Sequence, residues 1–160
     1  MLPVRARRHG FSVLELLIAL ALLGVLATVS LPLAETVRQR ERERELKQAL
    51  WTLREALDAY QAAALRLPEG VPPRTASGYP ATLTELARGL PDASAPGGHR
   101  RFLREIPRDP FADSRLPAEQ TWAVRAYASD AERPQAGADV YDVKSRSDRV
   151  GLNGVPLNRW

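Results

Sequence analysis

The sequence predicts an α+β protein in which a long N-terminal helix packs on a small antiparallel sheet. Two observations support this fold class. No Gly or Pro interrupts residues 34–67, which are rich in strong helix formers. Two short stretches near the C-terminus, residues 122–127 and 139–143, instead alternate apolar and polar residues as strands do. At 160 residues, the chain suits one modest domain in addition to a hydrophobic segment.

Residues 11–33 are almost entirely apolar and contain a single charged residue, Glu15. A helix needs about 20 apolar residues to cross the ~30 Å hydrocarbon core of a bilayer. We therefore expect a transmembrane helix over residues 11–33, with a modest kink at Pro32 near its end. Three arginines precede this segment. Because basic residues beside a span stay in the cytoplasm, the rest of the chain is expected on the opposite side of the membrane.

Glu15 is unusual in such a segment, because a carboxylate in an apolar transmembrane helix costs about 2.5–3.5 kcal/mol on insertion scales. It needs a charged partner, or it must reach the headgroups and water. A secretory signal peptide is a competing explanation of the N-terminus. The apolar run is longer than the roughly 7–15 residues of a signal peptide, and no A-x-A cleavage site follows it.

The N-terminus resembles that of the type IV pilin and type II secretion pseudopilin superfamily. The matching features are a basic leader that ends in Gly10, Phe11 directly after it, Glu15 four residues later, and a glycine and a proline further along the apolar run. The resemblance implies a leader over residues 1–10, cleavage between Gly10 and Phe11 by prepilin peptidase, and N-methylation of Phe11. It also implies filament assembly, in which the new Phe11 amine of one subunit pairs with the Glu15 carboxylate of another.

Residues 34–67 are predicted to continue the first helix as an amphipathic helix. Residues 38–47 are almost wholly polar, so we expect them either to be solvated or to pack on neighbouring subunits. Beyond them, six apolar residues recur at alternating spacings of four and three, which places them on one face of a helix. These residues are Leu46, Leu50, Leu53, Leu57, Tyr60 and Ala64. We interpret this face as the core contact with a globular head.

The head comprises residues 68–160. After a Pro- and Gly-rich loop, residues 82–90 are predicted to form a short helix, with Thr82 and Glu85 as a capping box. The two alternating stretches then form a C-terminal hairpin. The order of these elements resembles the pilin-like head of the major pseudopilin, in which a Pro-x-Asp-Pro-aromatic element precedes the sheet and a Tyr-Asp-x-x-Ser segment forms a late strand. The matching residues are Pro107, Asp109, Pro110, Phe111, Tyr141, Asp142 and Ser145.

Neither an enzyme nor a cofactor is predicted. The chain has no cysteine, its two histidines lie in the leader and in a loop, and no common catalytic motif is present. Major pseudopilins end in an Asp- and Gly-rich loop that binds calcium, an ion that takes six to eight oxygen ligands. Here Asp148 is a candidate ligand, but Asn153 and Asn158 stand where further acids would be expected. We therefore expect no metal site, with calcium at Asp148 as the alternative.

The resemblance implies a subunit of the periplasmic pseudopilus of a type II secretion system, held in the inner membrane of a Gram-negative envelope with its head in the periplasm. The implied partners are further copies of the chain, prepilin peptidase, the inner-membrane assembly platform and other pseudopilins. No nucleic acid is expected. Removal of the leader takes away three of the 23 basic residues, and the 19 acidic residues then nearly balance the basic residues that remain. The alternatives are a type IV pilin or minor pilin of a fibre or DNA-uptake apparatus, and a single-pass envelope anchor protein.

Overall fold

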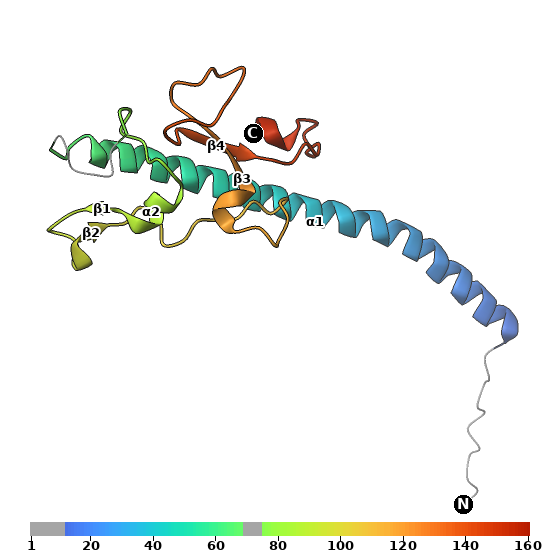
Figure 1. Cartoon of the computed structure of the whole chain (residues 1–160). Coiled ribbons are helices and arrows are strands. Elements are labelled where there is room, and N and C mark those ends of the chain that lie inside the picture. Colours follow the sequence, from blue (N-terminus) through green and yellow to red (C-terminus); the bar gives the residue numbers. More distant parts are fainter. Residues whose placement is uncertain (1–11, 69–74) are drawn as a thin grey trace, which may run out of the picture. The chain divides into compact units, whose positions relative to one another are not determined.

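The structure is a computed structural model that describes residues 12–68 and 75–160, without the side chains of residues 27–33. It divides into two compact units, one up to Gln39 and the other from Arg40 to Trp160. The helix α1 (Val13–Ala64) contributes to both units (Figure 1). Two small antiparallel sheets accompany it, so the predicted α+β fold is confirmed.

In the first unit, Ser12 caps the start of α1. Its hydroxyl oxygen accepts the N–H of Leu14 at 3.3 Å, and its carbonyl accepts the N–H of Leu16 at 3.1 Å. Such a cap satisfies amides that have no partner within the helix. Among the described residues, no helix has the length and apolar character needed to span a membrane. The main chain of α1 is helical across Pro32, and the modest kink predicted there stays a prediction.

The core of the second unit is built on one face of α1. All six residues of the predicted apolar face are buried, with at most 3% of each exposed. They form one cluster with Leu86, Leu90, Trp122 and Val143 from the rest of the head. Burying a large apolar side chain stabilises the folded state by about 1.5–3 kcal/mol. The prediction that this face meets the head is confirmed.

The buried face of α1 begins one turn earlier than the apolar pattern indicates. Glu43, within the polar segment that was expected to be solvated or to meet other subunits, is only 7% exposed. Its carboxylate accepts the main-chain N–H of Leu152 at 2.8 Å. The segment near the C-terminus has an amide that needs an acceptor, and a carboxylate on α1 supplies it.

The short helix α2 (Thr84–Arg88) forms within the predicted range, but its capping box does not. Glu85 instead accepts the N–H of Ala81 at 3.1 Å and the hydroxyl of Tyr60 at 3.0 Å. Burial, together with the neighbouring carboxylate, raises the pKa of Tyr60, so its hydroxyl remains a donor. Glu85 thereby connects α2 to α1 across the core.

A two-residue ladder follows α2, and the sequence analysis did not predict it. Strand β1 (Leu90–Pro91) pairs antiparallel with β2 (His99–Arg100). Gly89 makes this pairing feasible, because its φ is +83° and a Cβ there would lie 2.4 Å from the carbonyl oxygen of Arg100. Neither strand is long enough to show an alternating pattern in the sequence.

The second sheet is the predicted C-terminal hairpin. Strand β3 (Trp122–Arg125) pairs antiparallel with β4 (Asp142–Ser145), with Trp122 opposite Ser145. Strand β4 starts three residues later than predicted, because Asp139 uses its carboxylate to accept the N–H of Tyr127 at 2.8 Å and the hydroxyl of Ser77.

The described part of the chain also contains three short 3-10 helices, η1 (Pro96–Gly98), η2 (Ala118–Thr121) and η3 (Leu157–Arg159).

We expect Leu53→Ala to lower the free energy of unfolding by about 2–5 kcal/mol, because it leaves a cavity in the fully buried face of α1. The measurement is urea unfolding of the detergent-solubilised chain, followed by tryptophan fluorescence. Leu152→Ala is the matched control, since this leucine is 47% exposed and contributes its main-chain N–H to the contact with Glu43. Equal losses in the two variants would contradict the assignment of the core.

Alkaline pH is expected to destabilise the head through Tyr79. Burial, followed by the nearby carboxylate of Asp58, raises the pKa of Tyr79 to about 12. The unfolded chain releases this proton near pH 10 while the native protein keeps it, so stability falls as pH rises from about 10 to 12, by up to about 1.4 kcal/mol per pH unit. In Tyr79→Phe, urea unfolding measured across this window should show a shallower decline. An unchanged decline would rule out this contribution.

Candidate functional site

Of the three residues of the predicted N-terminal site, Gly10, Phe11 and Glu15, the structure describes Glu15. Its carboxylate lies in the first turn of α1, where a negative charge is favoured by the partial positive charge of the helix end. Gly10 and Phe11, on which cleavage, methylation and subunit pairing depend, lie outside the described residues. In the sequence, Phe11 directly precedes the capping residue Ser12 and lies four residues before Glu15.

The apolar side chains of α1 around Glu15 have no core of their own. Between Val13 and Leu26, the large apolar side chains are 53–76% exposed. They occupy the whole circumference of the helix rather than one face. A helix of this kind is buried in its working environment, either in lipid or among other helices. The first part of α1 therefore has one carboxylate, Glu15, near its start and an exposed apolar surface that requires an apolar partner.

Residues 5–31 match the family described as the prokaryotic N-terminal methylation motif. This motif indicates a type IV pilin-like protein that is processed by prepilin peptidase, is anchored in the cell envelope and assembles into a filament. The matched range contains Gly10, Phe11 and Glu15, the residues of the predicted N-terminal site. Comparisons with curated proteins and with solved structures gave no match.

In the head, the structure brings together the two segments that resemble the major pseudopilin. Asp109 is 3% exposed, and its carboxylate accepts the hydroxyl of Ser145 at 2.6 Å and the N–H of Phe111 at 2.8 Å. Ser145 in turn accepts the N–H of Ser147 at 3.0 Å. The loop before the sheet is therefore fixed to strand β4 by one buried carboxylate.

Arg54 is a second connecting residue, and the sequence analysis did not identify it. It extends from α1 and donates through Nε to Asp142 at 2.9 Å, and through Nη2 to the carbonyl oxygens of Val143 at 3.2 Å and Trp160 at 3.1 Å. One guanidinium thus joins the helix, strand β4 and the segment after η3. An arginine can make this contact because its donors form a rigid, planar fork.

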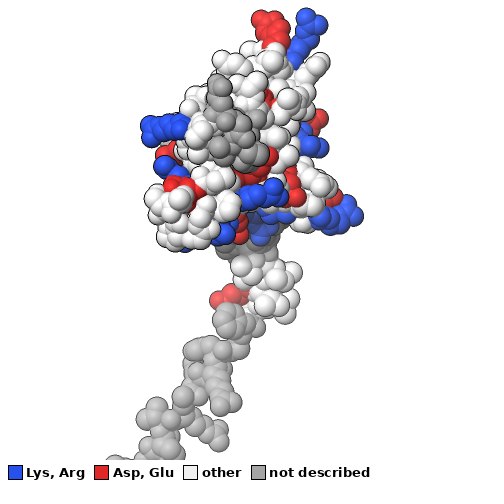
Figure 2. All heavy atoms as spheres, turned by 60° about the vertical axis from the view of Figure 1, so that its left-hand side comes forward, with Lys and Arg blue, Asp and Glu red and all other residues white. Residues whose placement is uncertain are grey.

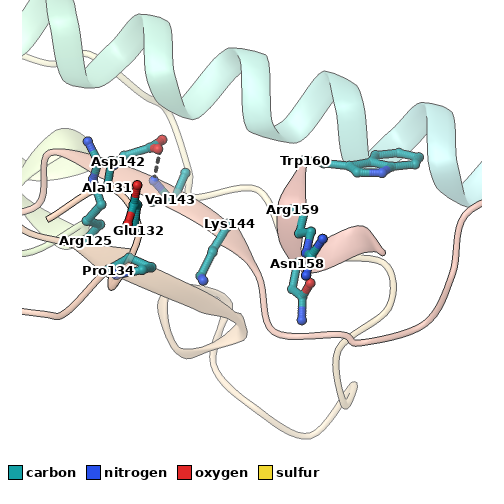
Figure 3. A pocket seen from close by; sticks show the side chains of 10 residues that line it. All are labelled: Arg125, Ala131, Glu132, Pro134, Asp142, Val143, Lys144, Asn158, Arg159 and Trp160. Atoms are coloured by element: carbon teal, nitrogen blue, oxygen red, sulfur yellow. Dashed lines mark hydrogen bonds between the residues drawn. The ribbon is translucent and has the colours of Figure 1, made fainter. Parts of the chain in front are cut away.

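A cavity of about 470 Å³ opens beside the hairpin and η3. Figure 3 shows Arg125, Glu132, Pro134 and Asp142 at one end of it, Asn158, Arg159 and Trp160 at the other, and Lys144 between them. Asp142 is already engaged by Arg54. The lining contains no Ser, Thr, Cys or His, so the chemistry that this cavity offers is ion pairing and hydrogen bonding.

Asp148, the candidate calcium ligand, is exposed. In the part of the chain that the structure describes, no three side chains of His, Cys, Asp or Glu are grouped so as to hold a metal ion. The buried acid that the sequence analysis did associate with the pseudopilin pattern, Asp109, is occupied by hydrogen bonds within the head. The expectation that the protein works without a cofactor stays a prediction.

We expect Ser145→Ala to destabilise the head by about 1–3 kcal/mol, because it leaves a buried carboxylate oxygen of Asp109 without its donor. The measurement is chemical unfolding of the full chain in detergent. Ser94→Ala is the matched control, since Ser94 donates to Asp92 at the same distance of 2.6 Å but on the surface, and it should change little. A double-mutant cycle with Asp109→Asn then gives the coupling energy, which should be clearly different from zero.

Proposed function

We propose that this protein is a structural subunit of the periplasmic pseudopilus of a type II secretion system. The proposal depends chiefly on the match of residues 5–31 to the N-terminal methylation motif, with Glu15 at the position that an assembling subunit requires. The head gives further support, because the two segments that resemble the major pseudopilin contact each other through Asp109 and Ser145. Residues 11–33 would hold the precursor in the inner membrane, with the head in the periplasm.

Assembly would follow from charge pairing in an apolar environment. Cleavage after Gly10 creates an amine at Phe11 and leaves Glu15 four residues further on. In a low-dielectric helix bundle, a lone charge is heavily penalised and a paired one is tolerated. An incoming subunit would therefore join only where its Phe11 amine meets a Glu15 carboxylate, and the pair would fix the register of neighbouring helices. The exposed apolar side chains of α1 would leave the lipid to pack on one another.

The proposed role needs no catalytic group, cofactor or nucleic acid. Basic and acidic side chains are interspersed over the face of the molecule in Figure 2, which is the pattern of a soluble protein surface rather than of a nucleic-acid interface. The proposed partners are further copies of the chain, prepilin peptidase, the inner-membrane assembly platform and other pseudopilins. A type IV pilin or minor pilin is the second candidate, because its N-terminal motif is the same.

Co-expression of the full chain with a prepilin peptidase should remove residues 1–10 and add one methyl group at Phe11, which intact-mass and N-terminal peptide spectrometry detect. Glu15→Gln should still be processed, but sheared filaments should decrease by at least about tenfold, because one charge of the pair is left unpartnered. Glu35→Gln is the control, since it removes an exposed carboxylate of α1 beyond the apolar segment.

A mature chain that still begins at Met1 would contradict the proposal. Deletion of the gene in its natural host separates the two candidates. Loss of secreted enzymes from the medium supports the pseudopilus, whereas intact secretion with loss of twitching or DNA uptake identifies a type IV pilin instead.

A further inference from the structure

Trp51 is the most exposed large aromatic side chain in the second half of α1. It is 70% exposed, whereas Leu50 and Leu53 on either side of it belong to the core. Its side chain therefore lies on the side of the helix that faces away from the head's own core. Tryptophan is among the residues most enriched in the energetic centres of protein interfaces. Exposure alone does not define an interface, so the residues around Trp51 must also be suited to binding a partner.

Five charged residues lie on the same helix face as Trp51, and their signs are segregated. At about 100° per residue, each lies within about 40° of Trp51 around the helix axis. The residues on the N-terminal side are basic and those on the C-terminal side are acidic: Arg40, Arg44 and Lys47, then Glu55 and Asp58. We call these six residues the Trp51 face. All of them are exposed.

Within the part of the chain that the structure describes, no ion pair neutralises these charges. Among the described residues, the ion pairs are Arg54–Asp142 and Arg115–Asp113, and neither involves the Trp51 face. Two of the charges are nevertheless held in place: Lys47 lies 4.7 Å from the centre of the Trp160 ring, and Asp58 accepts the hydroxyl of Tyr79 at 3.4 Å. The face therefore presents exposed charges, two of them held in place, that retain their capacity to pair with another molecule.

The basic residues of the Trp51 face precede Trp51 and the two acidic residues by a constant number of positions, so one copy of the face can pair with another. Arg40 precedes Trp51 by 11 residues, Arg44 precedes Glu55 by 11, and Lys47 precedes Asp58 by 11. Eleven residues make about three helical turns, or about 16.5 Å along the axis. A parallel copy displaced by that distance would set a cation against the tryptophan ring and two cations against two carboxylates.

We propose that the Trp51 face binds a second copy of this chain, arranged parallel and displaced by about three helical turns. This inference rests on the proposed function, because subunits inserted in the membrane with one orientation meet in parallel. Burial of the tryptophan supplies most of the affinity, and the charges select the displacement and disfavour others. An antiparallel pair is the competing arrangement, since it would place Lys47 opposite Glu55 around a Trp51–Trp51 contact.

The full chain, processed and assembled in cells, tests this contact by cysteine crosslinking, which is clean because the chain has no cysteine of its own. A chain with Arg44→Cys and Glu55→Cys should form disulfide-linked ladders in the parallel arrangement. A chain with Lys47→Cys and Glu55→Cys should crosslink efficiently only in the antiparallel one. The control pair replaces Glu55 and Arg42, which is exposed on the opposite side of the helix from Trp51.

Trp51→Ala gives an independent measurement. Because this side chain is exposed in the subunit, the urea midpoint of the detergent-solubilised chain should be unchanged, while filaments recovered by shearing should fall about tenfold. Lys47→Glu should reduce filament yield, and Lys47→Glu combined with Asp58→Lys should restore it.

Normal, Glu15-dependent filaments without the ladder from positions 44 and 55 would overturn the inference and leave the proposed function standing. Ladders from the antiparallel pair would overturn it as well. If the chain is neither processed nor assembled and no ladder forms, both the proposed function and the inference fail.

Discussion

The structure of the head depends on one face of one helix. Each of the other regular elements is short: α2 has five residues, β1 and β2 have two each, and β3 and β4 have four each. Two-stranded sheets of this size are not stable in water without a surface to pack on. The apolar face of α1 is that surface, and Leu46 to Ala64 provide about five turns of it. The order of the head elements matters less than their common contact with this helix.

Because the strands are short, side chains take over the connecting role that longer ladders have in other α+β proteins. Asp109 holds the loop before the sheet to β4, Glu85 holds α2 to α1, and Arg54 holds α1 to β4. Each is a partly or fully buried polar group that uses several hydrogen bonds in one place. Buried polar networks of this kind favour one arrangement strongly, since any other leaves a charge without a partner.

The sequence predicted those parts of the fold whose signal is local. The face from Leu46 to Ala64 follows from a spacing that needs no knowledge of the partner, and the N-terminal motif follows from residue types at fixed positions. Arg54 and Glu43 gave no such signal, because Arg54 and Asp142 are 88 residues apart and Glu43 and Leu152 are 109 apart. A charged residue on an amphipathic helix is ordinarily solvated, so only the folded head reveals which charges are used.

The division of α1 into two halves explains why one helix can both carry a head and build a filament. Its first half is apolar on all sides and has no internal core, so it is completed by lipid or by other helices. Its second half gives one face to the head and keeps the opposite face exposed. Whatever contacts a second copy through the second half must use that remaining face, because the other is already buried. Trp51 and the segregated charges beside it lie there, which is where a repeated contact between identical chains has room to form.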